Sequence, residues 1–152
     1  MPGLERFVDA QTAVYDQVRS ELAAGRKSSH WMWFIFPQLR GLGRSSIAQL
    51  YGIADLSEAQ ALLGHPVLGP RLIECARLVL AVRGRTVHQI FGSPDDLKLR
   101  SCMTLFELAA PEESVFGEVL DRYYGGVRDQ ATLDLVQEIL RTHRSSNLNL
   151  RP

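Results

Sequence analysis

Glycines, prolines and capping residues divide this sequence into short segments, and within each segment apolar residues recur at three- and four-residue steps. Steps of that size place apolar side chains on one face of a helix. The aromatic run WMWFIF at 31–36 could pass for a strand, but the sequence around it offers no second strand to pair with. The sequence therefore predicts an all-α fold, a compact multihelical domain of about seven to eight helices.

The expected helices follow from their start and stop residues. The first runs from Leu4 to about Leu22 and stops at Gly25. The clearest start is Ser-Pro-Asp-Asp at 93–96, because it combines a capping hydroxyl, a first-turn proline and acids at the positive end of the helix dipole. The remaining helices are predicted at about 45–51, 57–64, 65–84, 86–92, 94–110, 111–124 and 129–143, and residues 143–152 are expected to form a flexible tail.

Length and composition are those of one globular domain spanning residues 1–152. With 45% hydrophobic and 22% charged residues, the chain can bury a core without a disulfide or metal. Seventeen acidic residues balance seventeen basic ones, and no basic run appears, so nucleic-acid binding is not expected. Isolated Cys75 and Cys102 are expected to be reduced core residues. No leader or long apolar run appears, so we expect a cytoplasmic protein without membrane association.

The segment GRKSSHWMWFIFPQLRGLG at 25–43 is the densest group of large and functional side chains. Rings that stack beside an ammonium and an imidazole suit a nucleobase or ribose-phosphate ligand. The alternative is a structural aromatic core. Trp31 and Trp33 diverge by about 200° on a helix, so we expect one to pack inward and the other to lie near a rim or pocket. The candidate residues are His30 as a general acid or base, and Lys27, Trp31, Trp33 and Gln38 for ligand binding.

A second polar group lies in SPDDLKLRSCMTLF at 93–106. Asp95, Lys98 and Ser101 or Cys102 follow one another at three- and four-residue steps on one stripe of a helix. The residues around them are apolar: Leu97, Leu99, Met103, Leu105 and Phe106. A central helix must provide partners for such groups, so Lys98 is a catalytic candidate and Ser101 a ligand-binding one. The alternatives are a surface ion pair between Asp95 and Lys98, and a capping role for Asp95.

The two lysines connect these segments. Lys27 and Lys98 are the only lysines among seventeen basic residues. Genome composition accounts for the excess of arginine, but a retained lysine can also supply a compact ammonium that arginine cannot.

A glycine-rich turn, GLGRSS at 41–46, precedes another predicted helix. Backbone N–H groups in such a turn can bind an anion, which makes Arg44 and Ser45 candidate phosphate contacts; a plain turn is the alternative. Metal chemistry has poor support, because the four histidines are scattered without ligand spacing. Ser101 follows Lys98 by three residues, which is the reverse order of the Ser-x-x-Lys motif of some hydrolases, so this pair does not indicate a serine nucleophile. We expect no metal site and no cofactor.

Five motifs carry a resemblance to a known family: HWMWFIFPQLRGLG, YGI, HPVLGPRL, IFGSPDDLKLRSCMTLF and YYGG. In this order they resemble the bacterial domain of unknown function 1810 (DUF1810) family, over nearly the whole chain. The resemblance implies an all-α multihelical fold and brings no established reaction. Some members are labelled calpastatin, a label without weight here because calpain inhibitors of that name are disordered and this chain is globular. The resemblance also suggests kinship with NADAR-type proteins, small helical enzymes that act on ADP-ribosyl and nucleotide N-glycosidic bonds.

Two kinds of function are consistent with these observations. The first is a small-molecule-binding protein, or a hydrolase or glycosidase, for a nucleotide or ADP-ribose-like ligand, with the two polar segments lining one pocket. The second is a non-enzymatic protein-interaction module whose aromatic segment is part of the core. The sequence does not decide between them and leaves the oligomeric state open.

Overall fold

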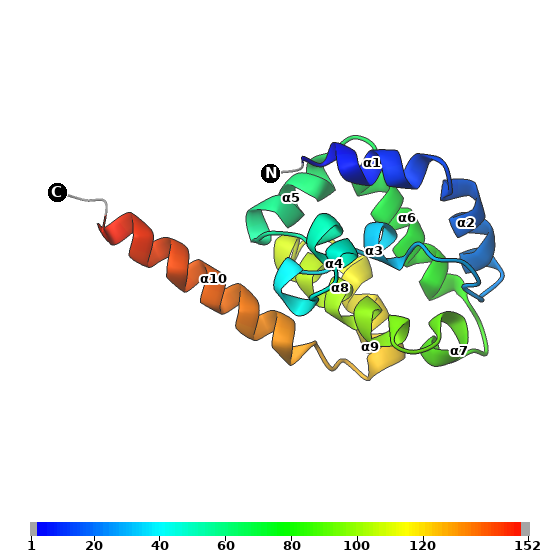
Figure 1. Cartoon of the computed structure of the whole chain (residues 1–152). Helices are drawn as coiled ribbons and strands as arrows, with labels where there is room; N and C mark the ends of the chain where they lie inside the picture. Colours follow the sequence, from blue (N-terminus) through cyan, green and yellow to red (C-terminus); the bar gives the residue numbers. More distant parts are fainter. Residues whose placement is uncertain (1–2, 150–152) are drawn as a thin grey trace.

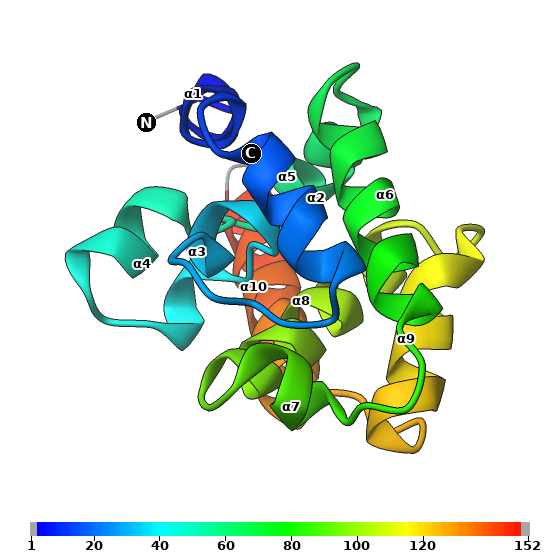
Figure 2. The ribbon, with the colours of Figure 1, turned by 90° about the vertical axis from the view of Figure 1, so that its right-hand side faces the viewer.

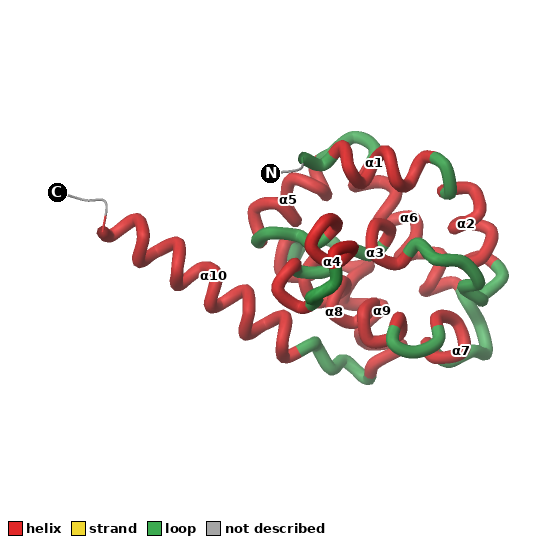
Figure 3. Tube along the Cα trace, in the orientation of Figure 1, coloured by secondary structure: helices red, strands yellow, loops and turns green. Residues whose placement is uncertain are grey.

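The computed structural model describes residues 3–149, with side chains described up to residue 144. This part of the chain forms ten α-helices and one 3₁₀-helix joined by loops, and it contains no strand (Figures 1 and 3). The prediction of an all-α fold is confirmed. In chain order the elements are α1 (Glu5–Thr12), α2 (Tyr15–Ala23), α3 (Met32–Ile35), η1 (Arg40–Leu42), α4 (Ser46–Tyr51), α5 (Leu56–Gly64), α6 (Leu68–Ala81), α7 (Val87–Phe91), α8 (Asp95–Ala109), α9 (Ser114–Tyr124) and α10 (Gln130–Asn149).

Helix α8 is the centre of the fold. Helices α5, α7, α9 and α10 all pack against it, and Figure 2 shows it enclosed by its neighbours. The reason lies in its sequence, since the run from Ser101 to Phe106 is buried at every position. A helix that is buried on all sides belongs in the interior of a domain.

The predicted number of seven to eight helices is too low. The structure divides the expected first helix at Val14, whose backbone (φ −122°, ψ 0°) is not helical. The Val14 N–H donates a hydrogen bond to the Gln11 carbonyl and closes a three-residue turn. This turn hardly changes the spacing of the apolar residues, so the sequence pattern does not reveal it. This turn lets α1 pack against α3 while α2 packs against α6. The aromatic segment adds the second extra helix, the single turn α3.

Helix α10 also differs from the prediction. It continues to Asn149, where the sequence predicted an end near His143. Its first half packs against α8 and η1, and its second half extends away from the other helices (Figure 1). The predicted flexible tail therefore overlaps a helix at 143–149, and its last residues, 150–152, lie outside the described residues.

One close backbone contact sets the angle between α5 and α6. A Cβ atom added at Gly69 would lie 2.0 Å from the carbonyl oxygen of Leu63, whereas one added at Gly64 would meet nothing within 4 Å. Only glycine allows the start of α6 to approach the end of α5 this closely.

We expect Gly69→Ala to lower the free energy of unfolding by about 2 kcal/mol or more, because the new methyl group must push the two helices apart. Gly64→Ala is the matched control, and it should leave stability unchanged or raise it by up to about 1 kcal/mol. Urea unfolding of both variants measures the difference. Equal stability of the two variants would contradict this account of the α5–α6 contact.

Candidate functional site

A buried carboxylate organises the loop between α2 and α3. Glu21, 7% exposed, accepts hydrogen bonds from the Ser28 and Ser29 N–H groups at 2.8 and 3.1 Å. The Ser29 hydroxyl donates to it at 2.6 Å and the Trp31 indole N–H at 3.0 Å. Burial raises the pKa of Glu21, but these four hydrogen bonds lower it by more, and the resulting pKa is about 2. The carboxylate thus stays ionised and holds the loop in one conformation.

This loop carries Lys27 to the start of α8. The Lys27 N–H donates to the Ile90 carbonyl at 2.7 Å, which fixes the backbone beside α7. The Lys27 ammonium lies 2.9 Å from the Asp95 carboxylate, donates to the Ser29 carbonyl at 2.7 Å and lies 5.0 Å from the Trp31 ring centroid. With a side chain that is 7% exposed, Lys27 is committed to contacts inside the protein.

Asp95 brings the two predicted polar segments together. Its second carboxylate oxygen lies 3.7 Å from the Lys98 ammonium, which also lies 3.7 Å from the centre of the Trp33 ring. Both lysines of the chain therefore converge on one carboxylate. We call Lys27, Trp33, Asp95 and Lys98 the two-lysine cluster. Of the two alternatives considered for Asp95, the structure shows the ion pair with Lys98 rather than a capping contact, and it adds a second ion pair with Lys27.

The two tryptophans point to different surroundings, as their spacing predicted. Trp31 is 1% exposed and packs against the rings of Phe36 and Phe91, with centroids 6.2 and 6.4 Å away. It is part of the hydrophobic core, so the structure places this ligand-binding candidate away from the surface. Trp33 is partly exposed, and the Lys98 ammonium lies over its face.

The other candidates of the 25–46 region make contacts outside this cluster or are exposed. His30 is exposed in the loop before Trp31. Gln38 is partly buried, and its backbone carbonyl accepts from the Ile53 N–H at 2.9 Å. The Ser45 hydroxyl accepts from the Ala48 N–H at 3.1 Å and caps α4, which is the plain-turn alternative. Arg44 is exposed in the same turn.

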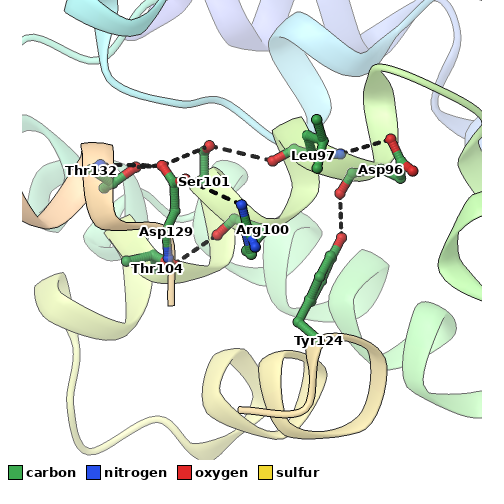
Figure 4. A network of polar contacts seen from close by, with 8 residues as sticks. All are labelled: Asp96, Leu97, Arg100, Ser101, Thr104, Tyr124, Asp129 and Thr132. Carbon is green, nitrogen blue, oxygen red and sulfur yellow. Dashed lines mark hydrogen bonds and ion pairs between the residues drawn. The ribbon is translucent and has the colours of Figure 1, made fainter. Parts of the chain in front are cut away.

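Ser101 serves a different purpose from the one predicted. Its hydroxyl lies 3.0 Å from a carboxylate oxygen of Asp129, and the same oxygen accepts from the Thr132 N–H and hydroxyl at 3.1 and 2.6 Å (Figure 4). Asp129 thereby caps α10, and Ser101 ties that cap to α8. The structure does not bring Ser101 into contact with the residues of the two-lysine cluster.

Asp96, the residue after Asp95, pairs with His88. The Asp96 carboxylate lies 3.2 Å from Nδ1 of His88, a side chain that is 67% exposed. The Asp96 backbone carbonyl accepts from the Tyr124 hydroxyl (Figure 4). Burial raises the pKa of the Tyr124 phenol, so it remains a donor.

Two pockets lie away from the two-lysine cluster. One of about 650 Å³ lies along α5 and α6, and one of about 610 Å³ lies along α10. Apolar side chains and two charged ones line the first: Leu63, Pro70, Ile73, Glu74, Arg77 and Leu78. The two-lysine cluster lines neither of them and is a surface site. In the described part of the chain no group of three His, Cys, Asp or Glu side chains could hold a metal ion. None of its helices is long and apolar enough to cross a membrane.

Comparison with known proteins identifies the family. A family model described as "Protein of unknown function (DUF1810)" matches residues 2–136. The chain belongs to this family. A crystal structure of the conserved hypothetical protein Rv1873 from Mycobacterium tuberculosis is 57% identical in sequence, with a TM-score of 0.87, over 88% of this chain and 96% of that chain. A comparison with curated proteins finds no match. Kinship with NADAR-type proteins stays a prediction.

Sequence reasoning missed Glu21 and underestimated Asp95. The sequence did indicate that Glu21 is buried, because it follows Val18 by three residues and directly precedes Leu22 on the buried face of α2. An acid on the apolar side of a helix needs several hydrogen-bond donors, and the serines at 28 and 29 are the ones that it finds. Nothing in the spacing indicated that Asp95 would meet Lys27.

The Glu21 contacts predict a pH-dependent stability. The pKa of Glu21 is lower in the folded state, about 2, than its ordinary value of 4.5. Stabilisation is therefore fully present above about pH 4.5 and is lost as the pH falls toward 2. Allowing for solvent screening, we expect it to be on the order of 2 kcal/mol.

Urea unfolding between pH 6 and pH 2.5 measures this effect. Glu21→Gln should be less stable than the parent chain at pH 6, and the gap should narrow as the pH falls, because the parent loses its charge there. The control is Glu118→Gln, an exposed acid on α9, for which the gap should stay small throughout. A gap for Glu21→Gln that does not change with pH would refute the proposed role of its charge.

Proposed function

We propose that this protein binds a small anionic ligand of the nucleotide or ADP-ribose class at the two-lysine cluster, as a binding protein or as a hydrolase or glycosidase acting on that ligand. One observation carries the proposal. Lys27 and Lys98, the only lysines of the chain, come from distant segments and meet at the Asp95 carboxylate beside the partly exposed ring of Trp33.

The two ammonium groups have different accessibility, which supports a division of roles. Lys27 is 7% exposed and holds Asp95 at 2.9 Å, whereas Lys98 is 22% exposed and lies 3.7 Å from the same carboxylate. A partly exposed pair at that distance contributes little to stability, so an incoming anion can draw the Lys98 ammonium away at low cost. Lys98 is therefore the proposed anion contact, and Lys27 keeps Asp95 in place.

For the enzymatic form of the proposal, His30 is the acid or base. Its imidazole is exposed in the loop next to Trp31, and histidine is the side chain that most often transfers protons in enzymes. Lys98 would stabilise the negative charge that develops on a phosphate or leaving oxygen.

The second candidate function is a protein-interaction module, and two observations favour it. Trp31 is a core residue, as that hypothesis expects of the aromatic segment. The pocket of about 650 Å³ along α5 and α6 is lined mainly by apolar side chains, and a side chain of a partner protein could bind in it.

A thermal-shift screen of AMP, ADP-ribose, NAD and ribose 5-phosphate tests the proposal. A ligand at 100 times its Kd adds about 2.7 kcal/mol of stability, which raises Tm by several degrees in a domain of this size. Lys98→Ala should abolish the shift. His30→Ala should leave the shift in place and remove any turnover of the ligand.

Arg83→Ala, which removes an exposed cation between α6 and α7, is the control and should behave like the parent chain. No shift with any of these ligands, or a shift that survives in Lys98→Ala, would argue against the two-lysine cluster as the binding site. The first of these results would favour the interaction module.

A further inference from the structure

We infer that the ligand binds by an exchange at Trp33: the Lys98 ammonium leaves the face of the indole, a planar ring of the ligand stacks in its place, and the ammonium pairs with the anionic group of the ligand. This inference rests on the proposed function. It names the ligand class more narrowly, as a planar heteroaromatic ring joined to an anion.

The position of Lys98 requires the exchange. Its ammonium lies 3.7 Å from the centre of the Trp33 ring. Non-bonded heavy atoms pack at about 3.5–4.0 Å, so the ammonium already occupies the layer in which a stacked ring would lie. A ligand ring can use this face of Trp33 only after the Lys98 side chain has moved.

The pairing around Asp95 keeps the exchange inexpensive. When Lys98 leaves, Asp95 still has the Lys27 ammonium at 2.9 Å, so no partly buried carboxylate is left without a partner. Lys98 also exchanges a weak partner for a strong one. Its distance of 3.7 Å to Asp95 is longer than the 2.7–2.9 Å of a charge-assisted hydrogen bond to an anion.

The surroundings of Trp33 are compatible with a stacked ring. The glycine-rich turn lies at the edge of the indole, since a Cβ atom at Gly43 would be 3.9 Å from Cζ3 of Trp33. The same atom would lie 2.6 Å from the methyl group of Ala48, so the turn approaches α4 closely at a position where glycine is required. Gly43 therefore adds no side chain next to Cζ3 at the edge of the indole.

The exchange requires a ring and an anion in one molecule. A ring without an anion must displace the ammonium and offers it nothing in return. An anion without a ring can pair with Lys98 but leaves the indole face without a partner. A mononucleotide satisfies both requirements, whereas a nucleoside or a sugar phosphate satisfies one.

Titration followed by the indole N–H signals in NMR tests this inference with AMP, adenosine and ribose 5-phosphate. Two such signals are expected, and Trp33→Phe assigns them by removing one. AMP should shift the Trp33 signal and bind more tightly than either fragment. Lys98→Ala, which removes both the charge and the side chain that covers the indole face, is the decisive variant.

The exchange predicts effects of opposite sign in Lys98→Ala. AMP should bind at least tenfold more weakly, because its phosphate loses the ammonium. Adenosine should bind about two- to fivefold more tightly, because no cation–π contact must be broken first. Lys98→Arg is the control; it keeps the charge over the ring and should not strengthen adenosine binding.

The two proposals fail in different ways. If AMP binds and Lys98→Ala weakens it, but adenosine binding to that variant is unchanged, weaker or undetectable, the exchange is wrong and anion binding at the cluster stands. If AMP and ribose 5-phosphate bind equally tightly without moving the Trp33 signal, the exchange is wrong as well. If none of the three compounds binds, the proposed function and the exchange both fail for adenine nucleotides.

Discussion

The ionised carboxylate of Glu21 is the interaction on which the aromatic segment and the candidate site both depend. A charge buried at this depth destabilises a fold unless donors surround it, and Glu21 accepts four hydrogen bonds from residues 28–31. Those bonds orient the Trp31 ring within the core and hold the loop that carries Lys27. One acid on α2 thus couples core packing to the geometry of the surface cluster.

Helix α8 provides the other half of that geometry. Because it is buried along most of its length, its position is determined by four neighbouring helices, and its first turn is held rigidly at the surface. Asp95 and Lys98 lie on that first turn. The pair Lys27–Asp95 therefore joins a loop held by Glu21 to a helix held by the core, and the more exposed Lys98 remains the side chain that can respond to a ligand.

Local patterns predicted much of this arrangement. The all-α class, the central place of the helix at 95–109 and the opposite surroundings of Trp31 and Trp33 all follow from periodicity. Errors occurred where local spacing carried no information. The break at Val14 hardly changed the spacing of the apolar residues. Ser101 had the same three-residue spacing from Lys98 as Lys98 has from Asp95, but its hydroxyl contacts Asp129, just before α10.

The sequence by itself determined the helical class and most helix boundaries, because these depend on residues a few positions apart. It also showed that lysine occurs only twice, at Lys27 and Lys98. The tertiary structure alone decided that Lys27 and Lys98 share Asp95, and that Trp31 is core while Trp33 faces Lys98. It also revealed that the serines before Trp31 serve the Glu21 carboxylate. Contacts between distant segments depend on how whole helices pack, and no short-range pattern encodes that packing.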